Sequence, residues 1–279
     1  MADPALTLAF PKLNMDISII NNQPISGNDT LKALNKYTLV GSVKDNSGLV
    51  ASNFNGTVYP VIFDKKQTLQ TLGNDAASPV TNYTQQQAVL YKGKATVKNG
   101  VFSFSFIVPK DINYQVGSGR LSLYAENGST DANGMSNNFL VGGTSSNSII
   151  DVDGPLIKVF LNDEKFVNGG LVNEKPQLIV KLFDSSGINT AGTGIGHDIT
   201  ATIDGNDKNV LVLNNYYEAV NDSYQSGNIY FQLPVLAEGV HYLKIKAWDV
   251  ANNSSEKIIE FTVAAAKNLE ISHVLNYPN

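Results

Sequence analysis

The stretch QLIVKLFDSSGINTAGTGIGHDITATIDG, residues 177–205, decides the fold of this chain of 279 residues. Its first seven residues and its closing HDITATI are rich in β-branched side chains and are followed by Asp, which is typical of β-strands bounded by turns. Between them lie three alternating glycines, followed by His197 and Asp198; the glycines are Gly192, Gly194 and Gly196. The segment could be a phosphate-binding loop, a catalytic corner or a connection between two strands.

The strand that follows the glycines argues against phosphate binding. A dinucleotide or phosphate loop leads into a helix, whose N-terminal N–H groups bind the anion. Here HDITATIDG alternates as a strand does and ends in an Asp-Gly turn signal, and no G-x-x-x-x-G-K-[ST] string occurs in the chain. We therefore expect a glycine-rich connection with positive φ angles.

An earlier segment, TLVGSVKDNSGLVASNFNGTVYPVIFD (residues 38–64), repeats this pattern without the alternating glycines or the histidine. The aligned pairs are Asp45 with Asp184, Gly48 with Gly187, Gly100 with Gly227, and Leu121 with Leu243. The offset between the copies shrinks along the chain because the first copy carries a longer mid-domain loop, residues 64–87. Loop length changes at little cost whereas strand register does not, so we infer an internal duplication.

Short apolar runs of period two recur throughout the chain, and no segment keeps a 3.6-residue period. Strands of this length and spacing favour antiparallel sandwiches. The sequence therefore predicts an all-β chain of two tandem immunoglobulin-like antiparallel β-sandwich domains. We place a remnant of a preceding domain at residues 1–12, the first sandwich at 13–143, the second at 149–264, and a linker with the start of a truncated domain at 265–279.

The composition narrows the class of protein. Hydrophobic residues make up 42% of the chain, enough for a sizeable core, while 16% charged residues and 23 glycines favour a β-rich extracytoplasmic protein. The net charge of −5, without a dense Lys/Arg run, argues against nucleic acid as a partner. The chain has no Cys and no long apolar stretch, and its first residues lack the pattern of a secretory signal. We expect both ends to be cut positions in a longer protein.

The candidate chemical groups are few. A catalytic triad at His197 would need a nucleophile and an oxyanion hole, and the other histidines, His241 and His273, are scattered. We therefore expect His197 to be structural or solvent-facing, with an interface role as the less favoured alternative. Three turns are rich in side-chain oxygen atoms and begin at Asp151, Asp184 and Asp204. Calcium binding at these turns is an open alternative, although the EF-hand spacing is absent. We assign no catalytic residue, no metal ligand and no cofactor. Trp248, in the middle of a strand, is expected to anchor the second core.

Several strings resemble one family. DPALTLAFP (residues 3–11) resembles the end of the peptidase domain of gingipain-type cysteine peptidases. Longer strings look like the sortases of the bacterial type IX secretion system, which are similar to that family. They are FLNDEKFVNGGLVNEKPQL (160–178), the opening stretch from residue 184, LNNYYEAVNDSYQSGNIYFQL (213–233), EGVHYLKIKAWDVANNSSE (238–256) and ISHVLNYPN (271–279). The resemblance covers most of residues 151–279 and is weaker through the first copy.

The resemblance implies a parent protein at the cell surface, associated with the outer membrane. That parent would cleave the C-terminal signals of cargo proteins and attach the cargo to a lipopolysaccharide anchor, using a Cys–His pair. Neither catalytic residue maps onto this chain, which would correspond to the non-catalytic C-terminal β-sandwich region. We therefore expect no enzymatic activity from the chain itself. It would act as a scaffold that holds its own peptidase domain and docks onto an outer-membrane barrel of the PorV type and other attachment-complex proteins.

A carbohydrate-binding or adhesive cell-surface module is the alternative function. Exposed aromatic rings on one sheet face would favour it, and the candidates are Tyr216, Tyr217, Tyr224 and Tyr230. An independent hydrolase would need clustered carboxylates or a nucleophile–His pair in one cleft, and the sequence indicates no such grouping.

Overall fold

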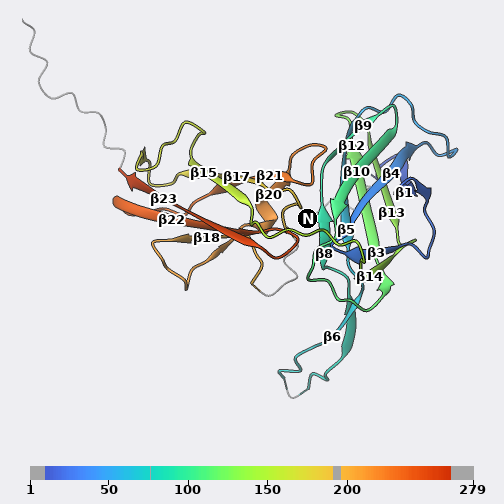
Figure 1. The fold of residues 1–279 in the computed structure, drawn as a ribbon, viewed down its shortest axis with the longest axis horizontal. Coiled ribbons are helices and arrows are strands. Elements are labelled where there is room, and N and C mark those ends of the chain that lie inside the picture. The colour runs from blue at the N-terminus through green and yellow to red at the C-terminus, as the bar shows by residue number, and fades with distance from the viewer. Residues whose placement is uncertain (1–9, 76, 191–195, 265–279) are drawn as a thin grey trace, which may run out of the picture.

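The computed structural model describes residues 10–75, 77–190 and 196–264, which are almost entirely strands and turns (Figure 1). The one helix among these residues is a short 3₁₀ turn, η1 (Asn214–Tyr216), so the all-β prediction is confirmed. No helix within these ranges has the length and hydropathy of a membrane span. The strands form two units, each with its own hydrophobic core: a barrel unit within residues 13–144 and a sandwich unit within residues 156–263.

Seven strands of the barrel unit form a closed cylinder. In order around it they are β12 (Arg120–Glu126), β13 (Asp131–Ser136), β1 (Leu13–Ile20), β4 (Lys36–Lys44), β10 (Val101–Ile107), β9 (Ala95–Lys98) and β5 (Gly56–Phe63). β5 pairs with β12 along most of its length and closes the ring. The expected two-sheet sandwich is therefore wrong for this unit. β9 pairs with β5, and β13 pairs with β1 in parallel, so the edges that a sandwich leaves open are joined.

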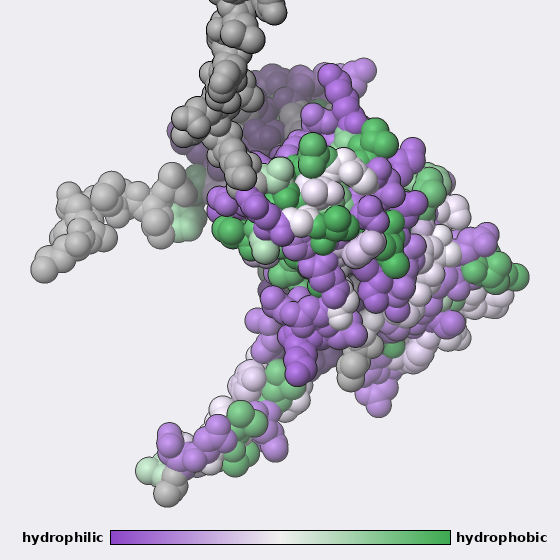
Figure 2. Space-filling model, turned by 90° about the vertical axis from the view of Figure 1, so that its left-hand side faces the viewer, coloured by the Kyte–Doolittle hydropathy of each residue, from purple (hydrophilic) through white to green (hydrophobic). Residues whose placement is uncertain are grey.

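The remaining strands of the barrel unit are short. They are β2 (Gln23–Pro24), β3 (Thr30–Ala33), β6 (Gln67–Gln70), β7 (Asn82–Gln85), β8 (Val89–Lys92), β11 (Gly117–Ser118) and β14 (Leu140–Thr144). β6 and β7 pair with each other and with no other described strand, so the expected loop of residues 64–87 contains a hairpin. Figures 1 and 2 show this hairpin standing away from the body as an arm. Its segment carries exposed hydrophobic side chains, among them Leu72, Val80 and Tyr83.

The sandwich unit consists of two sheets. One contains β15 (Leu156–Leu161), β17 (Gln177–Phe183), β21 (Ser226–Gln232) and β20 (Tyr217–Ala219); the other contains β16 (Leu171–Val172), β23 (Ser254–Val263), β22 (Gly239–Trp248), β18 (Thr200–Ile203) and β19 (Leu211–Val212). Buried residues of both sheets share one core, which includes Leu178 and Phe261. The pairing is not purely antiparallel, because β16 runs parallel to β23.

The strand register supports the duplication inferred from the sequence. In the barrel unit Ser42 of β4 lies opposite Val101 of β10, and the aligned positions in the sandwich unit, Lys181 of β17 and Asn228 of β21, also lie opposite each other. The parallel pair of β3 with β14 likewise has a counterpart in β16 with β23. The two copies therefore share one strand plan, and the closing pairs of the barrel distinguish the first copy from the second.

The parallel seam between β1 and β13 requires a residue without a side chain. A Cβ atom at Gly134 would overlap the carbonyl oxygen of Met15 in β1. We predict that Gly134→Val lowers the free energy of unfolding by about 2–3 kcal/mol, as overpacking in a tight contact does. Urea unfolding measures this loss. In the control, Gly128→Ala, the added Cβ meets nothing within 4 Å and only the positive φ of 82° is strained, so a loss of about 1 kcal/mol is expected. Equal losses of the free energy of unfolding in the two variants would contradict the close contact between β1 and β13 at Gly134.

Candidate functional site

A set of polar contacts joins the β20–β21 turn of the sandwich unit to β9 of the barrel unit. The carboxylate of Asp222 accepts hydrogen bonds from the backbone N–H and the hydroxyl of Thr96, both at 2.7 Å. The backbone N–H of Asp222 donates to the carbonyl oxygen of Lys94 at 2.8 Å, and the amide of Asn221 donates to the Thr96 hydroxyl at 2.8 Å. These bonds hold one short turn against one strand, and we call them the Asp222 clamp.

Aromatic side chains fill the joint beside the Asp222 clamp. Tyr91 of the barrel unit is 9% exposed and Tyr217 of the sandwich unit is 3% exposed. Burial raises the pKa of both phenols, because the charged form loses its hydration. Only about 10 Å³ of cavity remains between the residues of the two units here. The Nζ of Lys36 lies 5.2 Å from the centroid of the Tyr224 ring, so a cation–π contact also crosses the joint.

His197 lies at the same joint. Its Nδ1 is 2.7 Å from a carboxylate oxygen of Asp111 in the barrel unit, and its ring centroid is 4.3 Å from that of Trp248. Nearby, the backbone N–H of Lys110 donates to the carbonyl oxygen of Val250 at 2.8 Å. The glycine-rich connection thus leads to a side chain that links the two units, which is the interface role considered for His197.

Other expectations for this region have mixed outcomes. Gly196 has a φ of 85°, as expected, whereas Gly192 and Gly194 lie outside the described residues. Trp248 does not anchor the core. It is half-buried on the outward face of β22, between the His197 ring and the Nζ of Lys246 at 4.8 Å.

Three carboxylates meet close to the joint. One oxygen each from Asp151, Asp184 and Asp249 lies within 4.8 Å of the others, and Asp249 is fully buried. Burial raises the pKa of Asp184 and raises the pKa of Asp249 to about 6, and the like charges nearby add to both shifts. Three such carboxylates could hold calcium, which prefers oxygen ligands. No second feature of the described residues points to a cation, so we describe a buried acidic cluster and assign no metal.

The same turn behaves differently in the two copies. Asp45 and Asp184 each accept hydrogen bonds from the Ser two residues later, through its backbone N–H and its hydroxyl. In the barrel unit the turn is exposed, and the hydrogen bond from Ser47 is the main reason why the pKa of Asp45 is lowered. In the sandwich unit burial dominates and the pKa of Asp184 rises. Burial close to the joint therefore reverses the electrostatics of a duplicated turn.

The other candidate residues lie apart from this joint. His241 Nδ1 is 2.7 Å from Asp204, at the end of β18. Burial lowers the pKa of His241, but hydrogen bonds to the Ala237 carbonyl and to Asp204 outweigh this effect and the net shift is upward. His273 lies outside the described residues.

The four candidate tyrosines do not form one exposed platform. Tyr217 is buried and Tyr224 lies in the joint, while Tyr216 and Tyr230 are both 46% exposed. Tyr216 packs edge-on against Phe231, with ring centroids 4.7 Å apart. The contiguous aromatic face that would favour a carbohydrate-binding module is therefore not formed by these side chains.

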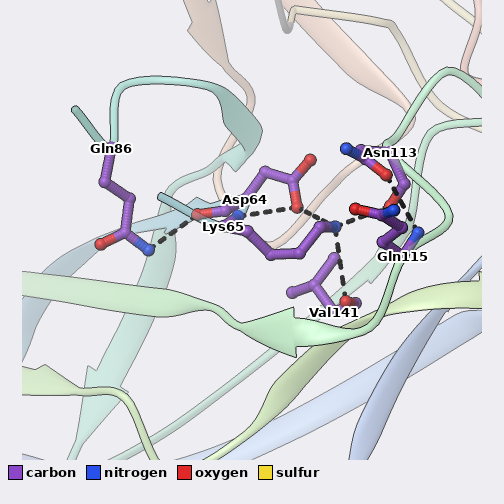
Figure 3. Close-up of polar contacts among 6 residues, drawn as sticks. All are labelled: Asp64, Lys65, Gln86, Asn113, Gln115 and Val141. Atoms are coloured by element: carbon purple, nitrogen blue, oxygen red, sulfur yellow. Dashed lines mark hydrogen bonds and ion pairs between the residues drawn. The ribbon is translucent and has the colours of Figure 1, made fainter. Parts of the chain in front are cut away.

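A polar cleft at the root of the β6–β7 hairpin was not found by sequence reasoning. It encloses about 640 Å³. Lys65 is its centre (Figure 3): the Nζ donates to Asp64 at 2.7 Å, to the Asn113 carbonyl at 2.7 Å and to the Val141 carbonyl at 3.4 Å. The amide of Gln86 donates to the Asp64 carbonyl at 2.7 Å. The Lys65 bonds tie the arm's root to the barrel unit, and the Gln86 bond joins the two sides of the root to each other. The Asp-Lys pair at the end of β5 is the only local signal of this site.

Comparison with solved structures identifies one clear relative. A crystal structure of dimeric latent PorU from Porphyromonas gingivalis is 35% identical in sequence over 96% of this chain, with a TM-score of 0.57. The chain is related to PorU. It spans 25% of the PorU chain, so the likeness concerns a part of that protein.

The other comparisons add nothing to this relation. A transglutaminase from red sea bream is 9% identical, with coverage of 92% of this chain and 32% of its own and a TM-score of 0.26. A bacterial ice-binding adhesin is 14% identical, with coverage of 93% and 66% and a TM-score of 0.26. Likenesses this low carry no argument. No family model and no curated protein matches the chain.

The ion pair of Lys65 and Asp64 is buried, with side chains 12% and 7% exposed. We predict that Lys65→Met lowers the free energy of unfolding by about 3 kcal/mol, because the Asp64 carboxylate stays buried without a cation. Asp64→Asn combined with Lys65→Met should restore more than half of the loss. The control is Lys181→Met, which breaks a more exposed pair with Glu164 and should cost about 1 kcal/mol or less. Urea unfolding that gives equal losses for the two Lys variants would contradict the assignment.

The acidic cluster predicts an unusual pH dependence. In a buffer that contains a metal chelator, the free energy of unfolding should rise by about 1–2 kcal/mol when the pH is lowered from 7 to 5. In the fold Asp249 takes up its proton near pH 6, whereas the ordinary value is 3.8, so in this window the unfolded chain binds fewer protons and acid favours the fold. His241, with a raised pKa, contributes in the same direction, so the difference between wild type and Asp249→Asn isolates Asp249.

Thermal unfolding across this pH range, with Asp45→Asn as the control, measures the effect. The rise should be reduced in Asp249→Asn and kept in Asp45→Asn. A pH dependence that is the same in wild type and in Asp249→Asn would contradict the raised pKa of Asp249.

Proposed function

We propose that this chain is a rigid, non-catalytic scaffold and docking region of a PorU-like sortase of the type IX secretion system. The observation that carries this proposal is the domain joint. Short connections between domains usually permit relative motion unless the interface is well packed. Here the Asp222 clamp, the buried Tyr91 and Tyr217, and the His197–Asp111 contact all join the two units. Two units joined by such a packed interface are suited to hold other domains at a fixed distance and angle.

In the full-length protein, the preceding peptidase domain would supply the chemistry. The parent would cleave C-terminal signals of cargo and attach the cargo to a lipopolysaccharide anchor, outside the cytoplasm at the outer-membrane surface. The 35% identity with PorU over nearly the whole chain supports this context. The scaffold would place the peptidase domain relative to an outer-membrane barrel of the PorV type.

The β6–β7 arm is the docking element of this proposal. Leu72 is 83% exposed and Val80 is 60% exposed, and both lie between the two strands of the hairpin, at the end farthest from the barrel unit. Exposed apolar side chains on a projecting segment are characteristic of protein contact surfaces. We therefore expect the arm to contact the partner, and a second copy of this chain is the competing occupant, because the related PorU structure is dimeric.

A pull-down from detergent-solubilised outer membranes tests the proposal. The purified chain should retain a PorV-type barrel. Leu72→Ser combined with Val80→Ser should reduce retention at least about tenfold, as loss of two apolar anchors does. Val167→Ser, an equally exposed apolar change in the sandwich unit, should leave it unchanged.

Other outcomes would contradict the proposal. Unchanged retention by the arm variant would reject the arm as the docking element. No retained barrel, together with binding to surface polysaccharide, would reject the scaffold role in favour of the carbohydrate-binding alternative. Light scattering on the same samples detects self-association, and a dimer lost in the arm variant would assign the arm to a second copy.

A further inference from the structure

The cleft at the root of the β6–β7 arm has the size of a ligand site. Its volume of about 640 Å³ lies within the range of roughly 300–1,000 Å³ that small-molecule pockets occupy. Three separate parts of the barrel unit form its walls: the root of the arm at residues 64–67 and 86, the loop of residues 113–119, and the ends of β12 and β13. A molecule bound here would contact the arm and the barrel at once.

The charge of the cleft is opposite to that of the whole protein. The chain carries a net charge of −5, yet the charged residues in this lining are Lys65, Lys66, Arg120 and a single acid, Asp64. Asp64 is already paired with Lys65 at 2.7 Å. Two cations therefore remain without an acidic partner in the lining, and side-chain amides such as that of Gln115 surround them. Such a lining attracts an anion, and its amide groups can form hydrogen bonds with the uncharged parts of the bound molecule.

Arg120 is held in place on two sides. Its guanidinium carbon lies 4.2 Å from the centroid of the Phe63 ring, and its Nη2 donates to the carbonyl oxygen of Gln86 at 3.1 Å. Its Nε is buried and has no hydrogen-bond partner among the described residues. A buried N–H donor without an acceptor is costly, and such groups are usually satisfied by a ligand, a water molecule or an ion. A fixed guanidinium with a free donor is suited to a carboxylate or a phosphate group.

We propose that this cleft binds a small hydrophilic anion through its carboxylate or phosphate group, with Arg120 and Lys66 as the partners of the charge. The proposal does not depend on the scaffold role. Because the walls include the root of the arm, the bound anion would also strengthen the attachment of the arm to the barrel.

NMR titration of the ¹⁵N-labelled full chain tests this site. The probes are inorganic phosphate, glucuronate and, as the neutral control, methyl glucoside. Phosphate or glucuronate should shift the Arg120 Nε–H signal and the backbone signals of Gly117 and Gly119, which line the cleft. Methyl glucoside should shift them much less. The two anions distinguish a phosphate ligand from a sugar carboxylate by their affinities.

Variants separate the site from general surface charge. Arg120→Gln and Lys66→Gln should each weaken binding about tenfold, as the loss of a charge-assisted hydrogen bond does. Lys98→Gln, an exposed change on β9 outside the cleft, should leave affinity unchanged. Lys66 is exposed and its side chain makes no ion pair with any residue that the structure describes, so its variant remains informative if Arg120→Gln unfolds. The proposal is overturned if the cleft signals stay fixed with both anions, if methyl glucoside binds equally well, or if Lys98→Gln weakens binding as much as Lys66→Gln.

Discussion

The carboxylate of Asp222 is the contact on which the two-unit architecture most depends. It accepts two hydrogen bonds from Thr96, so a turn in one unit satisfies donors of a strand in the other. Asp222 and Thr96 are exposed, and the buried Tyr91 and Tyr217 supply the part of the joint from which water is excluded. Without this joint, the chain would be two folded units connected by a linker and free to reorient. With it, the two units are held in one arrangement, which is the property that the proposed scaffold role requires.

Much of the fold was accessible from the sequence because it depends on local patterns. Period-two alternation predicts the strands, and the Asp-x-Ser-Gly turns mark equivalent corners in both copies, confirmed by the matched register of Ser42 with Val101 and Lys181 with Asn228. The closure of the barrel was not predicted. It depends on a parallel seam with two residue pairs between β1 and β13, and so short a long-range pairing leaves no periodic signal.

The site was predicted in part, for the same reason. His197 was singled out by its position after the glycines, but its partner Asp111 lies 86 residues away. The acidic turns at Asp151 and Asp184 were recognised, whereas Asp249 joins them only through the fold. The cleft depends on Lys65 reaching Asn113, a contact between residues that are 48 apart in sequence. Side chains that meet across strands and between units carry no local pattern, so spacing could not reveal them.

Residual dipolar couplings of the ¹⁵N-labelled chain test the central claim most directly, since they report how the two units are oriented in solution. The account predicts that couplings from the barrel unit and the sandwich unit fit one alignment tensor, and that Asp222→Ala combined with Thr96→Val produces two tensors of different magnitude while each unit stays folded. Two different tensors in the wild-type chain would contradict a rigid joint and, with it, the scaffold role.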